Sequence, residues 1–519
     1  MEINFNPGVT PVFLFFIRNK INYMKISTFI LTALMLFDVT AGFSQAGTLD
    51  SSFSKDGKVK STLLVGGSSI AIQPDGKILV ASASGFSVIR FKSNGTIDKS
   101  FGLNGVASTS FEGVNDCYLL ALQSDGKIIL AGYSIDNIDI FWISLARFTT
   151  SGLPDSSFGI NGQVKTDANY YLPTDIAIAA DGKILLSSTD PGYVTFTPDI
   201  SIWEYNNDGS VQDVFSYNSG EPGTRDISNA LAIQSTGKIV VAGALYNNDS
   251  IGSSFGMLRF RANGSLDNRF GTNSGKTILP YGEGKAMTLQ SNDKIIVLGD
   301  SIIFRFTKNG VPDSSFGTYG MIYPAFRGNS VEVQADGKII IAGRLFNGTD
   351  YDFAIARYTA KGKPDKTFGA NGIVTTDFGE NDNATSIALQ TDGKIAVAGS
   401  SVPESQSVRC VVARYKGDAS LHAKENVADI VAKHTLENSS AVIKMFPNPV
   451  QSILYVKLNA GGTVKRQINV YDINGKLVLT KSTNDNAQLD MKQLNAGVYL
   501  IKINDENAKE LYSGKVVKQ

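Results

Sequence analysis

The chain has 519 residues, including 51 glycines, and its 48 lysines and arginines balance 48 aspartates and glutamates. A formal net charge of zero removes the general electrostatic case for nucleic acid or an anionic membrane as a partner. The length allows more than one domain, and the glycine content suits many short strands joined by turns.

The N-terminal region predicts a secretory signal. From Met24, one lysine precedes the apolar stretch ISTFILTALMLF, and small residues follow up to Ala46. This order is typical of a signal peptide, which we place at residues 24–46, after a misassigned extension at residues 1–23. A transmembrane anchor is the alternative, but Asp38 interrupts the run and the run is short for a bilayer. The mature chain is therefore expected to be exported and to have no transmembrane span.

Seven copies of one fifteen-residue pattern follow, about fifty residues apart. In each copy an apolar strand enters a tight turn, a lysine follows the turn, and a second apolar strand leaves it, as in SIAIQPDGKILVASA. The copies begin at Ser69, Leu119, Asp175, Ala230, Ala286, Ser330 and Ser386. Repetition at this period indicates an architecture of stacked, similar units.

Each repeat has four strand signals. The first strand follows a glycine, as in GVAST from Gly105, the second and third flank the turn, and the fourth ends in a pair such as Arg90-Phe91. Asp-Gly predicts a two-residue type I′ hairpin with positive φ at both positions, which makes the flanking strands antiparallel and disfavours a parallel solenoid. We therefore predict an all-β fold, a seven-bladed β-propeller of about 53-residue repeats over residues 47–417.

Charged residues recur at a fixed spacing between repeats. The arginine of the fourth strand lies eight residues before an aspartate of the linking segment in Arg90 and Asp98, Arg147 and Asp155, Arg259 and Asp267, Arg305 and Asp313, and Arg357 and Asp365. Where the arginine becomes Glu204, the aspartate becomes Gln212. This joint loss indicates structural ion pairs rather than a ring of arginines for an anionic ligand.

The same spacing predicts how the ring of blades closes. Arg414 has no aspartate eight residues later, and Asp50, at the start of the expected mature chain, has no arginine before it in that mature chain. We expect these two side chains to pair, with a strand near residues 58–64 completing the last blade. A separation beyond about 10 Å would contradict this closure.

The repeat block LDxSFGxxG, AIQxDGKIxxAG and ARY closely resembles the delta-60 β-propeller repeats of secreted bacterial proteins. The resemblance covers residues 47–417. It implies a fold but no reaction, because that family has no settled biochemical activity.

A polar linker at residues 418–440 precedes renewed β patterning at residues 441–519, where Asn474-Gly475 predicts a second hairpin turn. The phrases FPNP, YDINGK and LNAGVYLI resemble the C-terminal sorting domain of the type IX secretion system of Bacteroidetes. The resemblance implies an immunoglobulin-like sandwich that engages the type IX machinery and is usually removed at the outer membrane. The protein would then be released or displayed on the cell surface. A resident binding domain is the alternative.

Catalytic signals are few. The only histidines, His422 and His434, lie in the linker, which excludes a Ser-His-Asp triad, a Cys-His pair and a histidine metal site from the propeller. Cys117 and Cys410 are expected to be buried thiols without a mutual disulfide. We therefore assign no catalytic residue, no metal ligand and no cofactor from the sequence.

Several Asp-rich stretches could bind calcium through their side-chain oxygens. These stretches are NNDGS at Asn206, NNDS at Asn247, NGTDYDF at Asn347 and GENDNAT at Gly379. None has a full calcium-loop pattern, so solvated turns are the favoured interpretation.

Function is expected on the face opposite the hairpin turns. In an antiparallel four-stranded blade, the turns and links lie on one face, and the variable loops lie on the other, where binding residues are typically found. The candidate ligand-binding residues on these loops are Tyr133, Asp136, Asp139, Tyr170, Tyr171, Tyr193, Tyr246, Asp249, Asp350, Tyr351 and Asp352. The leading hypothesis is a monomeric binding or scaffold module for an extracellular carbohydrate or protein. A glycoside hydrolase or lyase, with two carboxylates converging within about 5–10 Å, and a purely structural surface protein are the alternatives.

Overall fold

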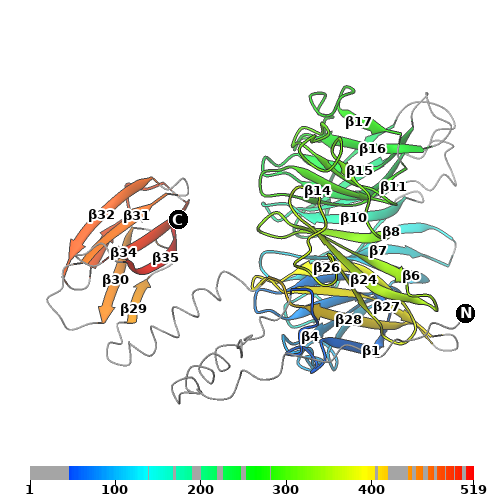
Figure 1. Ribbon diagram of the computed structural model, residues 1–519, viewed down its shortest axis with the longest axis horizontal. Helices are drawn as coiled ribbons and strands as arrows, with labels where there is room; N and C mark the ends of the chain where they lie inside the picture. Colours follow the sequence, from blue (N-terminus) through cyan, green and yellow to red (C-terminus); the bar gives the residue numbers. More distant parts are fainter. Residues whose placement is uncertain are drawn as a thin grey trace, which may run out of the picture. The chain divides into compact units, whose positions relative to one another are not determined.

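The computed structural model contains two compact units, divided between Ser420 and Leu421. It describes residues 46–137, 139–167, 171–189, 200–218, 226–246, 253–280, 282–403, 407–418, 442–446, 450, 452–459, 466–472, 476–484, 487–495, 497–504 and 510–518. Nearly all of the predicted signal peptide, the linker from residue 419 and both histidines therefore lie outside the described residues. In the described residues, the named elements of both units are all β-strands (Figure 1).

In its described residues, the first unit contains seven four-stranded antiparallel sheets. The inner strands of these sheets are β2 (Gly67–Ile72), β6 (Val114–Leu122), β10 (Leu172–Ile178), β14 (Ile227–Ile233), β18 (Gly284–Leu289), β22 (Gly328–Val333) and β26 (Asn381–Leu389). The second strands are β3 (Ile78–Ser82), β7 (Ile128–Ile135), β11 (Ile184–Thr189), β15 (Ile239–Tyr246), β19 (Ile295–Gly299), β23 (Ile339–Phe346) and β27 (Ile395–Val402).

Two further strands complete each sheet. The third strands are β4 (Phe86–Phe91), β8 (Phe141–Phe148), β12 (Ile200–Tyr205), β16 (Ser253–Phe260), β20 (Ile303–Phe306), β24 (Tyr351–Tyr358) and β28 (Arg409–Tyr415). The outer strands are β5 (Val106–Thr109), β9 (Gln163–Asp167), β13 (Val211–Tyr217), β17 (Lys276–Leu279), β21 (Met321–Ile322), β25 (Ile373–Thr376) and β1 (Lys58–Val65).

The inner strands form a closed ring. Each contacts the inner strand of the sheet before it and of the sheet after it, and β2 contacts β26. All inner strands therefore surround a common axis, which is the arrangement of a β-propeller. The predicted β-propeller is confirmed.

The two ends of the propeller segment share one sheet. The first strand, β1, runs antiparallel to β28, with Lys58 opposite Ala413 and Ser61 opposite Cys410. It is the outermost strand of the sheet that β26, β27 and β28 begin. Cys410 and Cys117 are both free and buried. The two cysteines form no disulfide with each other. Strand pairing therefore joins the first strand to the last three.

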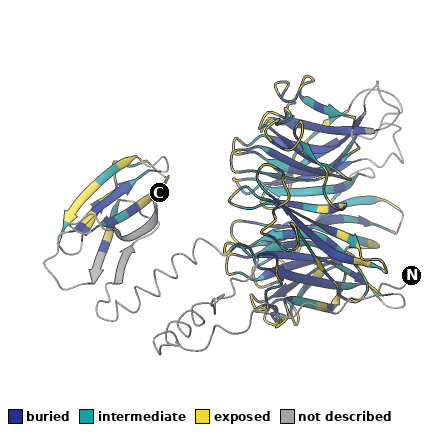
Figure 2. Cartoon of the chain, in the orientation of Figure 1, coloured by how far each residue is buried: buried dark blue, intermediate teal, exposed yellow. Residues whose placement is uncertain are grey.

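The second strands are apolar on both faces because both faces are covered. β3, β11 and β19 are buried along their whole length. In β3, Leu79 packs in a cluster with Leu130 of the next sheet, and Val80 packs in a cluster with Val412 of the previous one. Figure 2 shows the strand interiors dark blue and the turns and loops largely yellow.

A polar residue stands at a register shift in every inner strand. The residues at or next to the shift are Ser68, Tyr118, Thr174, Asn229, Lys285, Asn329 and Thr385. Several of them reach the next inner strand: Tyr118 Oη donates to the Pro173 carbonyl at 2.7 Å, and Thr385 Oγ1 donates to the Gly67 carbonyl at 2.7 Å. A bulge redirects a side chain, and here the redirected side chains link neighbouring sheets.

The hairpin turn differs from the predicted type I′ turn. Gly76 has φ 81°, but Asp75 is not among the described residues with positive φ. The Gly76 amide donates to the Gln73 carbonyl at 2.8 Å, and the Gln73 amide donates to the Lys77 carbonyl at 2.9 Å. This is a type I turn followed by a left-handed glycine, a three-residue hairpin loop. The type I′ prediction was wrong because Asp75 keeps negative φ and accepts the Lys77 amide on Oδ1 at 3.1 Å.

The C-terminal unit contains two antiparallel sheets in its described residues. One consists of β29 (Val442–Phe446), β30 (Ile453–Asn459) and β33 (Ala487–Asp490). The other has the order β32 (Leu477–Thr483), β31 (Arg466–Tyr471), β34 (Gly497–Asn504) and β35 (Glu510–Lys518). Leu454 and Leu489 of the first sheet share an apolar cluster with Ile468 and Ile501 of the second. The predicted Asn474-Gly475 turn lies outside the described residues.

Within the part of the chain that the structure describes, no helix has the length and hydropathy needed to cross a membrane.

Candidate functional site

The propeller has two dissimilar faces. The turn face carries the hairpin turns, such as residues 74–76, and the linking segments, such as residues 97–105. The variable face is the opposite one, with the loops that follow the second and outer strands, such as residues 347–350 and 377–380.

Ion pairs between an arginine of a third strand and an aspartate of a linking segment lie on the turn face. The nitrogen-to-oxygen distances are 3.0 Å for Arg90 and Asp98, 2.7 Å for Arg147 and Asp155, 2.9 Å for Arg259 and Asp267, 2.8 Å for Arg305 and Asp313, 2.9 Å for Arg357 and Asp365, and 2.9 Å for Arg414 and Asp50. Arg414 and Asp50 are separated by 364 positions in the sequence, so this pair joins the last repeat to the first.

These arginines are also bound to the following repeat. Arg90 Nη1 donates to the Thr150 carbonyl at 2.6 Å, and Arg414 Nη1 donates to the Ser93 carbonyl. Each guanidinium carbon lies 4.3 to 4.8 Å from the ring centre of a phenylalanine, namely Phe101, Phe158, Phe270, Phe316, Phe368 or Phe53. Aspartates and carbonyl groups of the protein accept the hydrogen bonds of these guanidinium groups, and a phenylalanine ring covers one face of each. The geometry therefore favours structural ion pairs over a ring of arginines that binds an anion.

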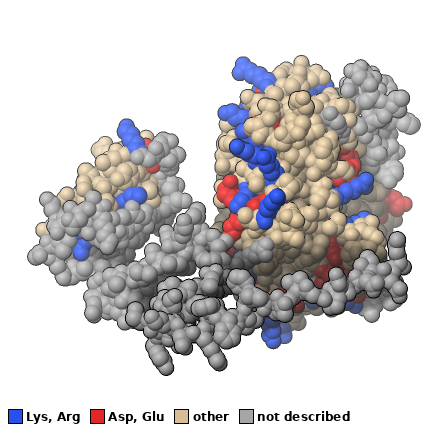
Figure 3. Space-filling view, in the orientation of Figure 1, with Lys and Arg blue, Asp and Glu red and all other residues tan. Residues whose placement is uncertain are grey.

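The lysine after each hairpin turn joins the same network, which the sequence did not reveal. Lys238 Nζ, for example, lies 2.8 Å from a carboxylate oxygen of Asp267. In each other repeat the equivalent lysine lies 4.0 Å or less from the carboxylate at the ion pair. In the third repeat Lys183 pairs with Glu204 at 2.7 Å. Glu204 thus supplies there the negative charge that an aspartate supplies elsewhere. Figure 3 shows lysine or arginine atoms beside carboxylate atoms at the left of the propeller unit.

The network keeps its aspartates ionised. Burial opposes ionisation of Asp155, but hydrogen bonds from Ser157 and Lys127 and the charge of Arg147 lower its pKa to about 2. Burial likewise opposes ionisation of Asp267, whose pKa the surrounding lysine, arginine and backbone groups lower to about 2. Hydrogen bonds to the charged form dominate the balance here.

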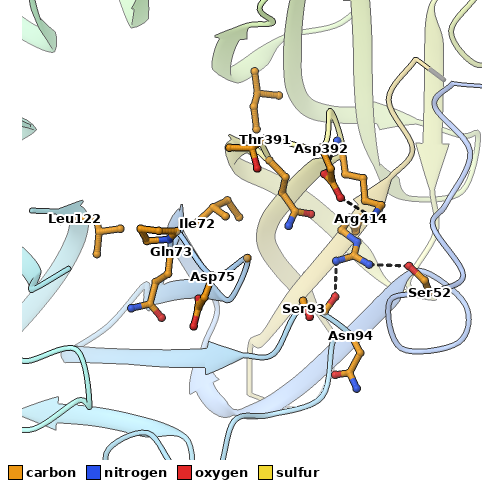
Figure 4. A pocket seen from close by; sticks show the side chains of 15 residues that line it. Ser52, Ile72, Gln73, Asp75, Ser93, Asn94, Leu122, Thr391, Asp392 and Arg414 are labelled. Carbon is orange, nitrogen blue, oxygen red and sulfur yellow. Dashed lines mark hydrogen bonds and ion pairs between the residues drawn. The ribbon is translucent and has the colours of Figure 1, made fainter. Parts of the chain in front are cut away.

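A hollow of about 800 Å³ opens on the turn face where the first and last repeats meet (Figure 4). It is lined by the inner-strand residues Ile72, Leu122 and Leu389 and by the turns beside them. Arg414 lies at its side and donates to Ser52 and Ser93. The sequence placed function on the opposite face and did not predict this hollow. The lining charge of Arg414 is already paired within the protein, so we assign no ligand there.

On the variable face, several predicted binding residues have internal roles. Tyr133 Oη donates to Asp116 at 2.7 Å, and Asp136 accepts the Trp142 Nε1 proton at 3.0 Å. Asp139 adopts φ 63° within the same loop. Tyr171 is half-buried and packs against a core cluster.

The predicted residues Tyr170, Tyr193 and Asp249, and the side chain of Tyr246, lie outside the described residues.

The loop between β23 and β24 presents an aromatic pair. Phe346 and Tyr351 are 54% and 37% exposed, and their ring centres are 5.3 Å apart. The Arg344 guanidinium lies 4.5 Å from the Tyr351 ring centre. Asn347 Oδ1 accepts the Thr349 amide at 2.8 Å, which holds the loop in a tight turn. The loop therefore offers a preformed apolar surface beside polar groups.

Three aspartates converge next to this loop. One carboxylate oxygen from each of Asp352, Asp377 and Asp382 lies within 4.8 Å of the others. Burial and repulsion from Asp377 and Asp350 raise the pKa of Asp352. Burial, with added repulsion from Asp377, raises the pKa of Asp382 to about 6. Asp350 is half-buried and accepts a hydrogen bond from Asn347 Nδ2 at 2.6 Å.

Comparison with known families matches both parts of the chain. The family described as "Domain of unknown function (DUF5122) beta-propeller" matches residues 73–101, 123–158, 234–270, 290–316, 334–368 and 390–421. The family described as "Secretion system C-terminal sorting domain" matches residues 444–519. The chain carries DUF5122 β-propeller repeats and a secretion sorting domain. The repeat match passes over residues 159–233, which contain Glu204 in place of the recurrent arginine.

The sorting domain directs a type IX export route to the cell surface or the extracellular space. No curated protein matches the chain.

Three solved structures show the degree of similarity. Virginiamycin B lyase from Staphylococcus aureus is 12% identical with a TM-score of 0.43, and the match covers 69% of this chain and 98% of that one. A protein of unknown function from Bacteroides caccae is 13% identical with a TM-score of 0.35, covering 58% of this chain and 98% of that one. A gluconolactonase from Xanthomonas campestris is 11% identical with a TM-score of 0.32, covering 57% and 91%. Likenesses of this degree contribute nothing to the assignment of function.

Two features of the variable face were not predicted from the sequence. Asp377 lies in no Asp-rich stretch that the sequence singled out, and its partners Asp352 and Asp382 belong to two such stretches thirty positions apart. The exposed Phe346 differs little in sequence from the buried aromatic residues that end other strands. A signal was available in the density of aspartate across residues 350–382, but only the fold places these side chains together.

Proposed function

We propose that this secreted propeller protein is a binding module whose ligand, a carbohydrate, contacts the variable face. The observation that supports this proposal most is the exposed aromatic pair Phe346 and Tyr351 on a turn held by Asn347. Aromatic faces pack on sugar rings, and the neighbouring carboxamide and carboxylate groups can bind hydroxyls. Val114 and Val402 are exposed at strand ends of the same face, at 59% and 42%. A protein ligand is the alternative occupant.

The carboxylate-dependent hydrolase or lyase is the second candidate, because three carboxylates converge on this face. Their oxygens all lie within 4.8 Å of one another. Glycosidases hold their two carboxyl groups about 5–10 Å apart, with the sugar between them. The observed spacing is shorter and leaves less room for a glycosidic bond, so binding is the better-supported function.

The test is affinity electrophoresis of the purified full chain through gels that contain defined polysaccharides, such as xylan, mannan and pectin. We expect at least one polysaccharide to retard the protein. We expect the double variant Phe346→Ser/Tyr351→Ser to bind that polysaccharide about tenfold more weakly or worse, because the stacking rings are removed. Its retardation in the gel should fall accordingly. The control is Lys363→Ala, a change at an exposed lysine on the turn face. Retardation of the double variant equal to that of the unchanged chain would contradict the proposal, and no retardation by any sugar would favour the structural or protein-binding alternatives.

A further inference from the structure

We propose that Asp352, Asp377 and Asp382 bind one calcium ion on the variable face. The three residues come from different elements: Asp352 is in β24, Asp377 follows β25, and Asp382 is in β26 of the next sheet. The proposed site goes beyond the carbohydrate-binding function and does not depend on it.

Strand pairing explains why the carboxylates meet. Phe353 of β24 lies opposite Thr376 of β25, so the adjacent positions Asp352 and Asp377 lie at the same end of this antiparallel pair. The chain then folds back on itself, because the Phe378 amide donates to Asp382 Oδ2 at 2.7 Å. The result is three carboxylates with oxygens within 4.8 Å of one another.

One of these carboxylates is buried without sufficient partners. Asp382 is fully buried, and its Oδ1 has no hydrogen-bond partner among the described residues. Buried polar atoms are almost always satisfied, and a buried charge that lacks a partner is costly. A bound cation would supply a partner for this buried carboxyl group, whose side chain converges with two further carboxylates.

The neighbouring positive charges do not fill this role. In the same loop, Glu380 has Arg409 as an ion-pair partner at 3.5 Å. Among the described residues, none of the three aspartates forms an ion pair with a lysine or arginine. Lys58 of β1 donates to the backbone carbonyl of Asp377 at 2.9 Å and not to its carboxylate. The charge of Lys60 acts on Asp382 only from a distance.

The chemistry of the donors selects calcium. All three side chains offer oxygen, which hard cations prefer, whereas zinc sites usually include nitrogen or sulfur ligands. Calcium accepts irregular arrangements of six to eight oxygens, so three carboxylates and water molecules can complete its shell, while magnesium requires a near-octahedral one. The protein is exported, and extracellular calcium modules bind with dissociation constants of about 10⁻⁴–10⁻³ M.

The test is calorimetric titration of CaCl₂ into the purified full chain after dialysis against EDTA, with thermal unfolding measured in parallel. We expect one calcium ion per chain, a dissociation constant of about 10⁻⁴–10⁻³ M, and a melting temperature of the propeller that rises with calcium concentration. No heat and no shift in melting temperature up to about 10 mM CaCl₂ would overturn the proposal, since that concentration saturates such sites. An equal response to MgCl₂ would overturn the choice of calcium.

Variants separate a calcium site from a merely structural cluster. Asp377 is exposed, so Asp377→Asn should fold, and it should weaken calcium binding by about tenfold or more because one charged ligand is lost. In EDTA this variant should melt no lower than the unchanged chain, because a like charge has been removed from beside Asp382. The control Asp213→Asn, at an exposed position of β13, should bind calcium normally. Calcium binding by Asp377→Asn equal to that of the unchanged chain would refute the site. Retained calcium binding in Phe346→Ser/Tyr351→Ser would show that the two proposals are independent.

Discussion

Replacement of Arg414 by methionine is expected to lower the free energy of unfolding of the propeller by about 3 kcal/mol, because removal of one partner of a buried ion pair leaves the other charge uncompensated. Asp50 is 3% exposed and would remain in place without the 2.9 Å guanidinium contact. Lys394 lies 3.8 Å from Asp50 and would compensate part of its charge. The expected loss in the free energy of unfolding is therefore at the lower end of the range for a broken buried ion pair. The same substitution also removes the hydrogen bond to Ser93 of the first repeat.

Urea unfolding followed by tryptophan fluorescence measures this effect. A matched control is Arg409→Met in the same strand, whose ion pair with Glu380 is partly exposed and should contribute less than about 1 kcal/mol. The double variant Arg414→Met/Asp50→Asn should be more stable than Arg414→Met alone, because no buried charge is left without a partner. A loss for Arg414→Met no larger than that for Arg409→Met would contradict the role of this pair in closing the ring.

Deletion of residues 444–519 is expected to abolish export of the propeller. These residues match the sorting domain, and the described strands of the C-terminal unit pack around a core of their own. The propeller core draws on other residues, so we expect the truncated chain to fold and to accumulate inside the cell envelope. Immunoblots of culture medium, cell surface and periplasm in a host with the type IX machinery measure the distribution.

Transfer of the same segment supplies the complementary test. Fusion of residues 441–519 to a folded periplasmic reporter should bring the reporter to the cell surface or the medium. Surface exposure of the truncated propeller at the level of the unchanged chain would show that another segment directs export.

Much of the propeller could be predicted from the sequence because its determinants are local or recur at a constant spacing. Apolar runs on either side of Asp75-Gly76 indicated an antiparallel hairpin, and comparison of seven copies in one chain related Arg90 to Asp98. The turn type could not be read in the same way. Asp75 tolerates the left-handed region, but it adopts the right-handed one because its carboxylate then accepts the Lys77 amide.

The candidate sites were less predictable because they depend on contacts between segments. Tyr171 and Tyr351 look alike in sequence, yet one packs against a core cluster and the other is exposed beside Phe346. Asp352 and Asp382 belong to separate stretches, and only the pairing of β24 with β25 brings Asp377 to them.

Repetition, strand patterning and sorting motifs are properties of short segments, so the order of residues was enough to predict an exported repeat propeller with a C-terminal sorting domain. It also identified Arg414 and Asp50 as the leftover members of a repeated pair. The convergence of three carboxylates on the variable face, and the contacts of the turn lysines with the ion pairs, became visible only once the chain was folded. The physical reason is that the interaction of two charges depends on their separation and burial in space, which chain positions such as Asp352 and Asp382 do not specify until the blades are packed.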